Sequence, residues 1–129
     1  IRMLHESGVQ PAIITGRKSE VVLHRARDLG IEYVMQGYRD KRPAFRDLLE
    51  KTGLEPQQVA YVGDDVVDLP VMVQSGLAIA VADAEDFVKQ HAHWITHRPG
   101  GRGAVRDACE FLMSARGVLD EKLASYLHP

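Results

Sequence analysis

The stretch VAYVGDDVVD, residues 59–68, joins a short apolar run to three carboxylates, Asp64, Asp65 and Asp68. The run from Val59 to Gly63 shows no polar alternation, which is typical of a strand buried on both faces of a parallel sheet. Carboxylates crowded into five positions repel one another unless a positive group lies among them. The stretch therefore predicts a buried strand whose carboxyl end carries an acidic site with a cationic partner.

Other apolar runs alternate with helical patterns on both sides of this stretch. The runs are PAIIT at 11–15, IEYVMQG at 31–37, LAIAV at 77–81 and a weaker HWIT at 93–96. Helices are expected at residues 19–29, 43–52, 70–76, 84–91 and 104–115. Strand and helix alternating about every 25 residues imply right-handed crossovers and a parallel sheet. We expect one α/β domain over residues 1–129, a three-layer sandwich with a parallel Rossmann-like sheet, ending in a polar tail at 118–129.

The composition is that of a soluble globular domain. Hydrophobic residues make up 45% and charged residues 26% of 129 residues, and the formal net charge is −2. This balance gives no indication of nucleic acid or a membrane surface as partner, and no apolar run approaches the ~20 residues of a membrane span. The single cysteine, Cys109, excludes an internal disulfide and favours a reducing, cytoplasmic compartment; we expect it in a helix core.

The carboxyl ends of the predicted strands carry an unusual set of side chains. Thr15, Gly16 and Arg17 follow the first run, Lys41 follows the second, and the three aspartates follow the third. Ligands of open parallel sheets bind beyond the carboxyl ends of the strands. Oxygen ligands without His or Cys suit Mg²⁺, while a hydroxyl, backbone amides and a lysine suit a phosphate. These ends predict Mg²⁺-dependent phosphoryl chemistry.

Four segments in this order resemble motifs of the haloacid dehalogenase superfamily of phosphatases, in its cap-less branch. They are AIITGRKS at 12–19, AYVGDDVVDLPVM at 60–72, GLAIAVADA at 76–84 and GGRGAVRDACEFLM at 100–113, with Lys41 between the first two. The resemblance implies hydrolysis of 3-deoxy-D-manno-octulosonate 8-phosphate, through an aspartyl-phosphate, in lipopolysaccharide sugar synthesis. It also implies Mg²⁺ and a homotetramer in which a neighbouring subunit helps to close each site.

The resemblance implies catalytic roles for two residues near the transferred phosphoryl group. Thr15 would donate a hydrogen bond to that group, and Gly16 would offer its backbone amide. Lys41 would bridge the phosphate and the carboxylate of the nucleophile.

The same resemblance divides the remaining residues between metal and substrate. Asp64 would bind Mg²⁺, while Asp65 and Asp68 would orient its ligands or Lys41 without touching the metal. Arg17 and Arg102 would face the carboxylate of the sugar acid.

One motif of the superfamily is absent from this sequence. That motif is a D-x-D at the end of the first strand, where the first Asp is the nucleophile and the second the general acid and base. No D-x-D precedes Thr15, and DAED at 83–86 follows the fourth strand instead. We therefore expect the nucleophile and a central strand to lie N-terminal to Ile1, and residues 1–129 alone to be inactive.

Three alternatives follow from the same residues. One is a phosphatase of a nine-carbon nonulosonate 9-phosphate, and another is a non-catalytic phosphatase-like module of a sugar-nucleotide synthetase. A phospho-receiver domain is disfavoured, because its acidic pair should follow the first strand and its lysine the last. The GGRG loop could be a plain flexible connection, and Arg102 a solvated side chain. The H-x-H of His91 and His93 indicates no metal site, because no third ligand lies nearby in sequence.

Overall fold

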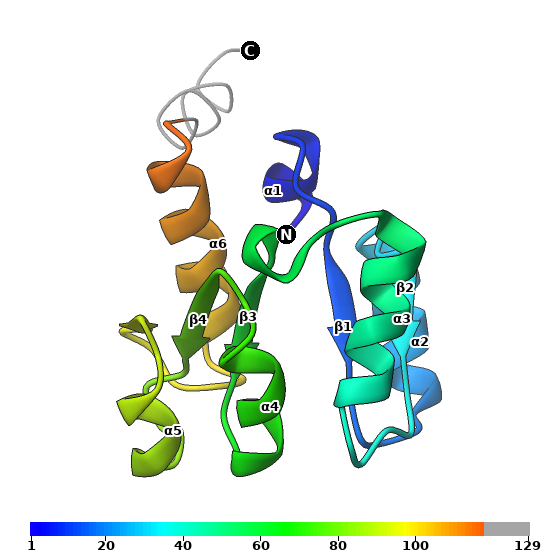
Figure 1. Cartoon of the computed structure of the whole chain (residues 1–129). Helices are drawn as coiled ribbons and strands as arrows, with labels where there is room; N and C mark the ends of the chain where they lie inside the picture. Colours follow the sequence, from blue (N-terminus) through cyan, green and yellow to red (C-terminus); the bar gives the residue numbers. More distant parts are fainter. Residues whose placement is uncertain (118–129) are drawn as a thin grey trace.

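The computed structural model describes residues 1–117, so the predicted tail at 118–129 lies outside the described residues. The helices of the described part are α1 (Arg2–Glu6), α2 (Glu20–Asp28), α3 (Arg42–Thr52), α4 (Leu69–Met72), α5 (Asp86–Gln90) and α6 (Ala104–Ala115), with 3-10 turns at Pro56–Gln58 and Val66–Asp68. The strands are β1 (Ala12–Ile14), β2 (Tyr33–Met35), β3 (Ala60–Gly63), β4 (Leu77–Ala80) and β5 (Trp94–Ile95). Helices and strands alternate as expected, and the α/β class is confirmed (Figure 1).

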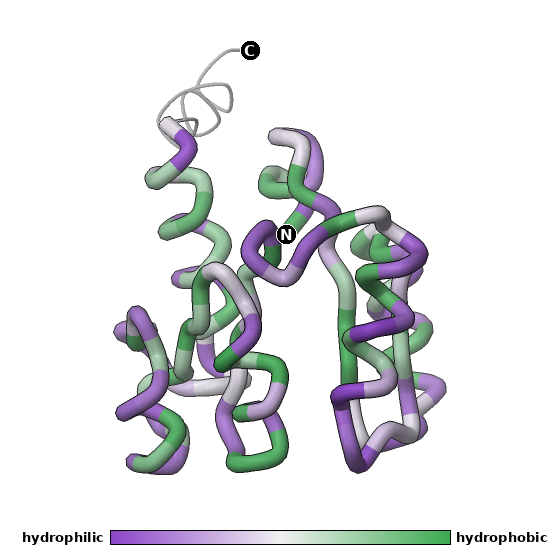
Figure 2. Tube along the Cα trace, in the orientation of Figure 1, coloured by the Kyte–Doolittle hydropathy of each residue, from purple (hydrophilic) through white to green (hydrophobic). Residues whose placement is uncertain are grey.

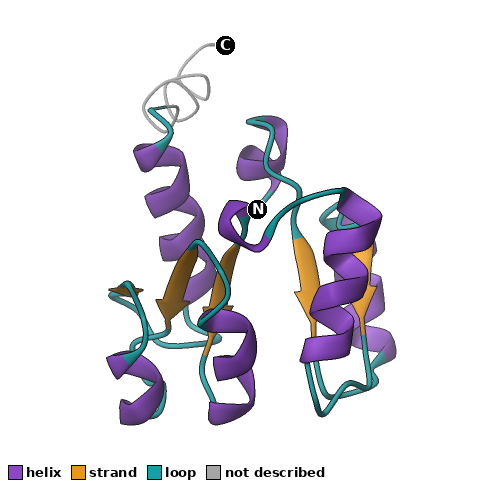
Figure 3. Ribbon diagram, viewed as in Figure 1, coloured by secondary structure: helices purple, strands orange, loops and turns teal. Residues whose placement is uncertain are grey.

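The strands form two separate parallel sheets rather than one. β1 pairs with β2, and β3 pairs with β4, which pairs with β5. No ladder joins β1 to β3, although Figure 3 shows both strands pointing the same way on either side of the middle of the molecule. The expected single sheet is therefore interrupted between β1 and β3, which is where a central strand would be missing.

The helix boundaries follow local chemistry that is readable in the sequence. Ser19 accepts a hydrogen bond from the Val22 amide at 3.3 Å and caps α2, as Ser does at many helix starts. Gly53 ends α3 with a φ of 70°, a conformation that glycine adopts without strain. Most boundaries differ from the prediction by one or two residues. The clearest difference is that α4 ends at Met72 rather than near Gly76, and residues 73–76 form a turn and a bend instead.

The best-formed core surrounds β4. Ala78, Ile79 and Ala80 are fully buried, and Val71 and Met72 of α4 and Val88 of α5 lie in the same interior. Figure 2 shows apolar strands inside and polar segments in the loops at their carboxyl ends. The core thus holds the ends of β3 and β4 in place.

A smaller core joins the two ends of the described chain. Cys109 and Met113 of α6 pack against Leu4 of α1, which confirms the expectation that Cys109 is buried. Trp94 stacks on Phe111 with ring centroids 4.3 Å apart. Within residues 1–117, every helix is too short or too polar to cross a membrane.

Candidate active site

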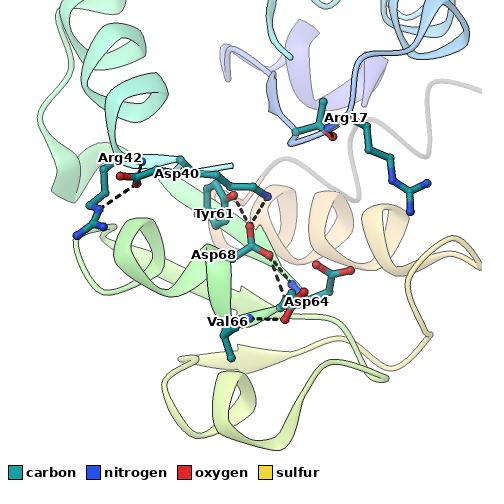
Figure 4. A network of polar contacts seen from close by, with 10 residues as sticks. Arg17, Asp40, Arg42, Tyr61, Asp64, Val66 and Asp68 are labelled. Atoms are coloured by element: carbon teal, nitrogen blue, oxygen red, sulfur yellow. Dashed lines mark hydrogen bonds and ion pairs between the residues drawn. The ribbon is translucent and has the colours of Figure 1, made fainter. Parts of the chain in front are cut away.

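Asp68 is the centre of a polar network at the carboxyl end of β3. Its side chain is almost fully buried, with the residue 1% exposed. Lys41 Nζ and the Tyr61 hydroxyl donate to Oδ1 at 2.5 and 2.7 Å, and the backbone amides of Asp64 and Asp65 donate to Oδ2 at 3.0 and 3.2 Å. Figure 4 shows this carboxylate between Tyr61 and the turn that carries Asp64. One buried group therefore fixes both a cation and the acidic turn, which we define as residues 64–68.

The network sets the ionisation of its members. Burial alone would raise the pKa of Asp68, but the hydrogen bonds from Lys41, Tyr61 and the Asp64 amide outweigh it and lower the pKa. Burial and the hydrogen bond to Asp68 raise the pKa of the Tyr61 phenol. At neutral pH the network is therefore a buried carboxylate held by an ammonium and a neutral phenol.

Backbone geometry brings this network together. Lys41 is the residue that precedes α3, and its side chain is 12% exposed. A Cβ added to Gly63 would lie 2.7 Å from Met72 Sδ and 2.8 Å from Asp68 Cβ, so only glycine lets the strand end approach the acidic turn so closely. The ion pair of Lys41 with Asp68 also links the β1–β2 sheet to the β3–β4–β5 sheet.

Asp64 differs from Asp68 because, among residues 1–117, no cationic side chain donates a hydrogen bond to its carboxylate. Burial raises its pKa, and the neighbouring Asp68 carboxyl raises it further; Lys41 partly opposes this. The Asp65 carboxylate accepts a hydrogen bond from the Val66 amide at 2.7 Å and so caps the 3-10 turn at Val66–Asp68. The Asp64 carboxylate is thus the member of the acidic turn that a further cation would stabilise.

An acidic cleft opens beside this turn. It is lined by Asp64, Asp65, Asp83, Glu85 and Gly100. Its oxygen donors suit Mg²⁺ chemically, yet within residues 1–117 no three carboxylate, imidazole or thiol groups are arranged to hold a metal between them. Mg²⁺ keeps several waters and needs only one or two protein carboxylates. The described residues therefore fit the ion through Asp64, with the remaining ligands supplied from elsewhere.

The predicted phosphate-binding residues lie at the end of β1, on the other side of the interruption. Thr15 is half-buried, and its Oγ1 accepts from the Arg17 amide at 3.2 Å. Among the described residues, no hydrogen bond or ion pair joins Thr15, Gly16 or Arg17 to the Asp68 network. Figure 4 shows the Arg17 guanidinium, from the loop after β1, without a contact to the other residues drawn. The structure thus gathers Lys41 and the aspartates but leaves these three residues apart.

Comparison with known proteins places the chain in a family. The model of the haloacid dehalogenase-like hydrolases matches residues 33–105. The chain belongs to this family. It is 50% identical over 121 residues to the 3-deoxy-D-manno-octulosonate 8-phosphate phosphatase KdsC of Salmonella typhi, covering 94% of this chain and 64% of that protein. The chain therefore spans somewhat less than two thirds of the length of the curated relatives that it matches.

Solved structures of haloacid dehalogenase-like proteins agree closely with this fold. A probable YrbI family phosphatase from Pseudomonas syringae superposes with a TM-score of 0.96 at 48% identity, covering 99% of this chain and 73% of that one. A 3-deoxy-D-manno-octulosonate 8-phosphate phosphatase from Moraxella catarrhalis, in complex with magnesium, phosphate and KDO, gives a TM-score of 0.94 at 38% identity. The alignment with the Moraxella catarrhalis protein covers 97% of this chain and 72% of that protein. Both alignments therefore cover nearly all of this chain.

Some features of this haloacid dehalogenase-like site were not predicted from the sequence. The sequence prediction gives Tyr61 no role beyond its strand, whereas its hydroxyl donates a hydrogen bond to Asp68 at 2.7 Å. It excludes Asp83 only as part of the nucleophile motif, whereas the Asp83 Oδ1 accepts a hydrogen bond from the Gly100 amide at 2.7 Å. Arg102 is exposed and has no side-chain partner among the described residues, so it is available to a ligand.

Proposed function

We propose that this chain is the larger part of a Mg²⁺-dependent phosphatase that hydrolyses 3-deoxy-D-manno-octulosonate 8-phosphate to the free sugar acid and phosphate. The observation that carries the proposal is Asp68, which holds the Lys41 ammonium beside the acidic turn. Within the described part of the chain, the Asp64 carboxylate of this turn forms no ion pair with a cationic side chain. The 50% identical relative from Salmonella typhi is a phosphatase of the same substrate, and the Moraxella catarrhalis relative was solved with Mg²⁺, phosphate and KDO.

Each predicted residue has a task in this proposal. Asp64 holds Mg²⁺, which when bound neutralises charge on the phosphoryl oxygens. Lys41, fixed by Asp68, adds a positive charge on the phosphate, and Thr15 donates a hydrogen bond to it. Arg17 faces the carboxylate of the sugar acid. Phosphoryl transfer depends mainly on such positioning and charge neutralisation. A Lys41 side chain that Asp68 holds in place therefore stabilises the phosphoryl group better than a mobile lysine would.

The nucleophile in this proposal comes from a strand between β1 and β3. An apolar cleft lies there, lined by Ile14 of β1, Tyr33 of β2, Phe45 of α3 and Ala60 and Tyr61 of β3, among others. Within residues 1–117 the facing edges of β1 and β3 have no ladder partner, and unpaired strand edges favour an added strand. A parallel strand in this position would end between Thr15 and Asp64.

The neighbouring subunit of a cytoplasmic homotetramer would close the site. Val66 and Val67 of the acidic turn and Phe87 of α5 are large apolar side chains that are 46–55% exposed. The 3-10 turn of the two valines contacts α5, and exposed apolar surface of this kind favours a protein contact. Analytical ultracentrifugation of the full-length gene product should give a tetramer, and Phe87→Asp should shift it toward smaller species. A monomeric wild-type protein would contradict this part.

Substrate profiling of the full-length gene product tests the proposed function. Phosphate release should be fastest with the eight-carbon 8-phosphate and should require Mg²⁺. A preference for a nine-carbon nonulosonate 9-phosphate would show that the proposed substrate is wrong and that the proposed Mg²⁺-dependent phosphate hydrolysis is right. Absence of turnover with every sugar-acid phosphate, in a folded protein, would favour the non-catalytic module.

A further inference from the structure

The glycine-rich segment beside the acidic cleft is held by side chains that have no part in the chemistry described above. We define residues 98–103 as the rim loop. Gly100 of this loop lines the acidic cleft together with Asp64 and Asp83. The GGRG sequence predicts mobility, since each glycine enlarges the set of accessible backbone conformations. The observed contacts oppose that mobility at three points.

The first point is Asp83, in the turn after β4. Its Oδ1 accepts a hydrogen bond from the Gly100 amide at 2.7 Å. Asp83 itself is exposed, and this contact is its only hydrogen bond or ion pair within the described residues. Its carboxylate thus has no evident task other than to hold the middle of the loop against the cleft.

The second point is Asp107, in the first turn of α6. Its side chain is 7% exposed and receives three hydrogen bonds from Arg98: the backbone amide at 2.8 Å to Oδ2, and Nε and Nη2 at 2.8 and 2.5 Å to Oδ1. A Cβ added to Gly103 would lie 2.8 Å from Arg98 Cδ, so the glycine lets the Arg98 side chain cross the end of the loop. The two ends of the loop are therefore fixed to each other.

The third point is Thr96, which is 3% exposed. Its hydroxyl accepts from the Ala82 amide at 3.0 Å and donates to the Arg98 carbonyl at 2.6 Å. The start of the rim loop is thereby joined to the turn that carries Asp83. With Arg98 occupied by Asp107, Arg102 is the arginine of the loop that remains available to an anion.

We propose that Asp83 and Asp107 are positioning residues that hold the rim loop, with Gly100 and Arg102, in place against the non-phosphate part of the substrate. This inference rests on the proposed function, because it needs a sugar acid attached to the phosphate in the acidic cleft. A loop ordered before binding pays less conformational entropy when the substrate arrives. The two carboxylates therefore act on selectivity for the sugar acid, and phosphoryl transfer belongs to Lys41 and Asp64.

The test uses the full-length gene product and two readouts. The first readout is the order of residues 100–103, measured by amide exchange and backbone relaxation. The second is the ratio of kcat/KM for the sugar-acid 8-phosphate to kcat/KM for p-nitrophenyl phosphate, which lacks the sugar acid. Loss of one loop hydrogen bond should lower this ratio about fivefold in Asp83→Ala, through KM.

Matched variants separate positioning from general damage. Asp83→Asn keeps an acceptor oxygen for the Gly100 amide and should restore both readouts, whereas Asp83→Ala should mobilise the loop. Asp86→Ala removes a nearby exposed carboxylate without a loop contact and should change neither readout. Asp107→Asn removes the charge that holds Arg98 and should lower the ratio as Asp83→Ala does.

Each outcome decides the proposal. A rim loop that stays ordered in Asp83→Ala, or a loop that loosens while the ratio keeps its wild-type value, would overturn it. Failure of the proposed function appears separately, as a wild-type protein that does not hydrolyse the sugar-acid phosphate. In that case the exchange measurement still decides whether Asp83 holds the loop.

Discussion

The two sheets of this molecule are made from similar sequences but are buried to different degrees. In β4 (LAIA) the last three residues are fully buried. In β1 (AII) Ala12 is exposed and Ile13 and Ile14 are only half-buried. Both strands have the composition of a strand covered on two faces, so composition alone does not decide burial. What differs is the number of neighbouring strands: β4 pairs with a strand on each side, whereas β1 pairs with one strand only within the described residues.

The weaker sheet is tied to the stronger one by a polar contact. Lys41 follows the β1–β2 sheet, and Asp68 follows β3. Between the two sheets lies the apolar cleft, which is lined by Ile14 from one sheet and Tyr61 from the other. A buried ion pair is costly to break from one side, because the remaining charge is left without a partner. The pair therefore contributes both to the site and to the link between the sheets.

The largest expected effect is a loss of stability when one isoleucine in each sheet is truncated to alanine. Ile79→Ala in β4 should lower the free energy of unfolding by about 4 kcal/mol, since a fully buried side chain leaves a cavity. Ile14→Ala in β1 should cost about 1–2 kcal/mol, because a half-buried side chain loses less contact. Urea denaturation of the two variants at one pH measures the difference. Equal losses would mean that β1 is as well packed as β4.

The ion pair provides the second test. Asp68→Asn should lower the free energy of unfolding by about 3 kcal/mol, because the Lys41 ammonium is left buried beside a neutral amide. Amide exchange should then accelerate in β1 and β2 more than in β4. The exposed pair of Asp40 with Arg42 offers a control, and Asp40→Asn should leave stability nearly unchanged because solvent screens this pair. Uniform acceleration across both sheets would contradict a linking role.

Sequence reasoning recovered the order of elements because strand runs and caps are local signals. Ser19, Gly53 and the apolar runs are each read within a few residues. It also placed Lys41 with the aspartates, since parallel strands end at one edge. It assigned Asp65 and Asp68 together to orienting the Mg²⁺ ligands or Lys41, and the structure shows that Asp68 is the one that contacts Lys41. Which of the two aspartates does so depends on the 3-10 turn at Val66–Asp68. The loop contacts of Asp83 and Asp107 depend on tertiary packing and leave no pattern in the sequence.

The pH dependence of stability is a smaller effect with a definite sign. The folded-state pKa of Asp68 lies below its ordinary value, so its ionised form stabilises the fold above an unfolded pKa of about 4. This contribution should be lost as the pH falls through the lower, folded pKa. Thermal melts from pH 7 downward should show wild type and Asp68→Asn converging in acid. A constant difference between them would contradict the assignment.

The smallest expected effect is a change in melting temperature when Asp64 is replaced in the absence of a divalent metal. Because burial and the Asp68 carboxyl raise the pKa of Asp64, its charge at pH 7 opposes folding. Asp64→Asn should therefore raise the melting temperature slightly in the presence of EDTA. Asp86→Asn should leave it unchanged, because the exposed Asp86 side chain makes no hydrogen bond or ion pair within residues 1–117. With millimolar Mg²⁺ the wild type should gain stability and Asp64→Asn should not. Equal Mg²⁺ stabilisation of both proteins would remove Asp64 from the metal site.

Phosphate release by the full-length gene product, titrated with Mg²⁺ in wild type, Asp64→Asn and Lys41→Ala, tests the site most directly. If the acidic turn and Lys41 neutralise a phosphoryl group together, wild-type turnover should rise with Mg²⁺. Both variants should then lose at least ~100-fold in kcat while keeping a native circular-dichroism spectrum. Near-normal turnover by a folded Asp64→Asn protein would contradict the account.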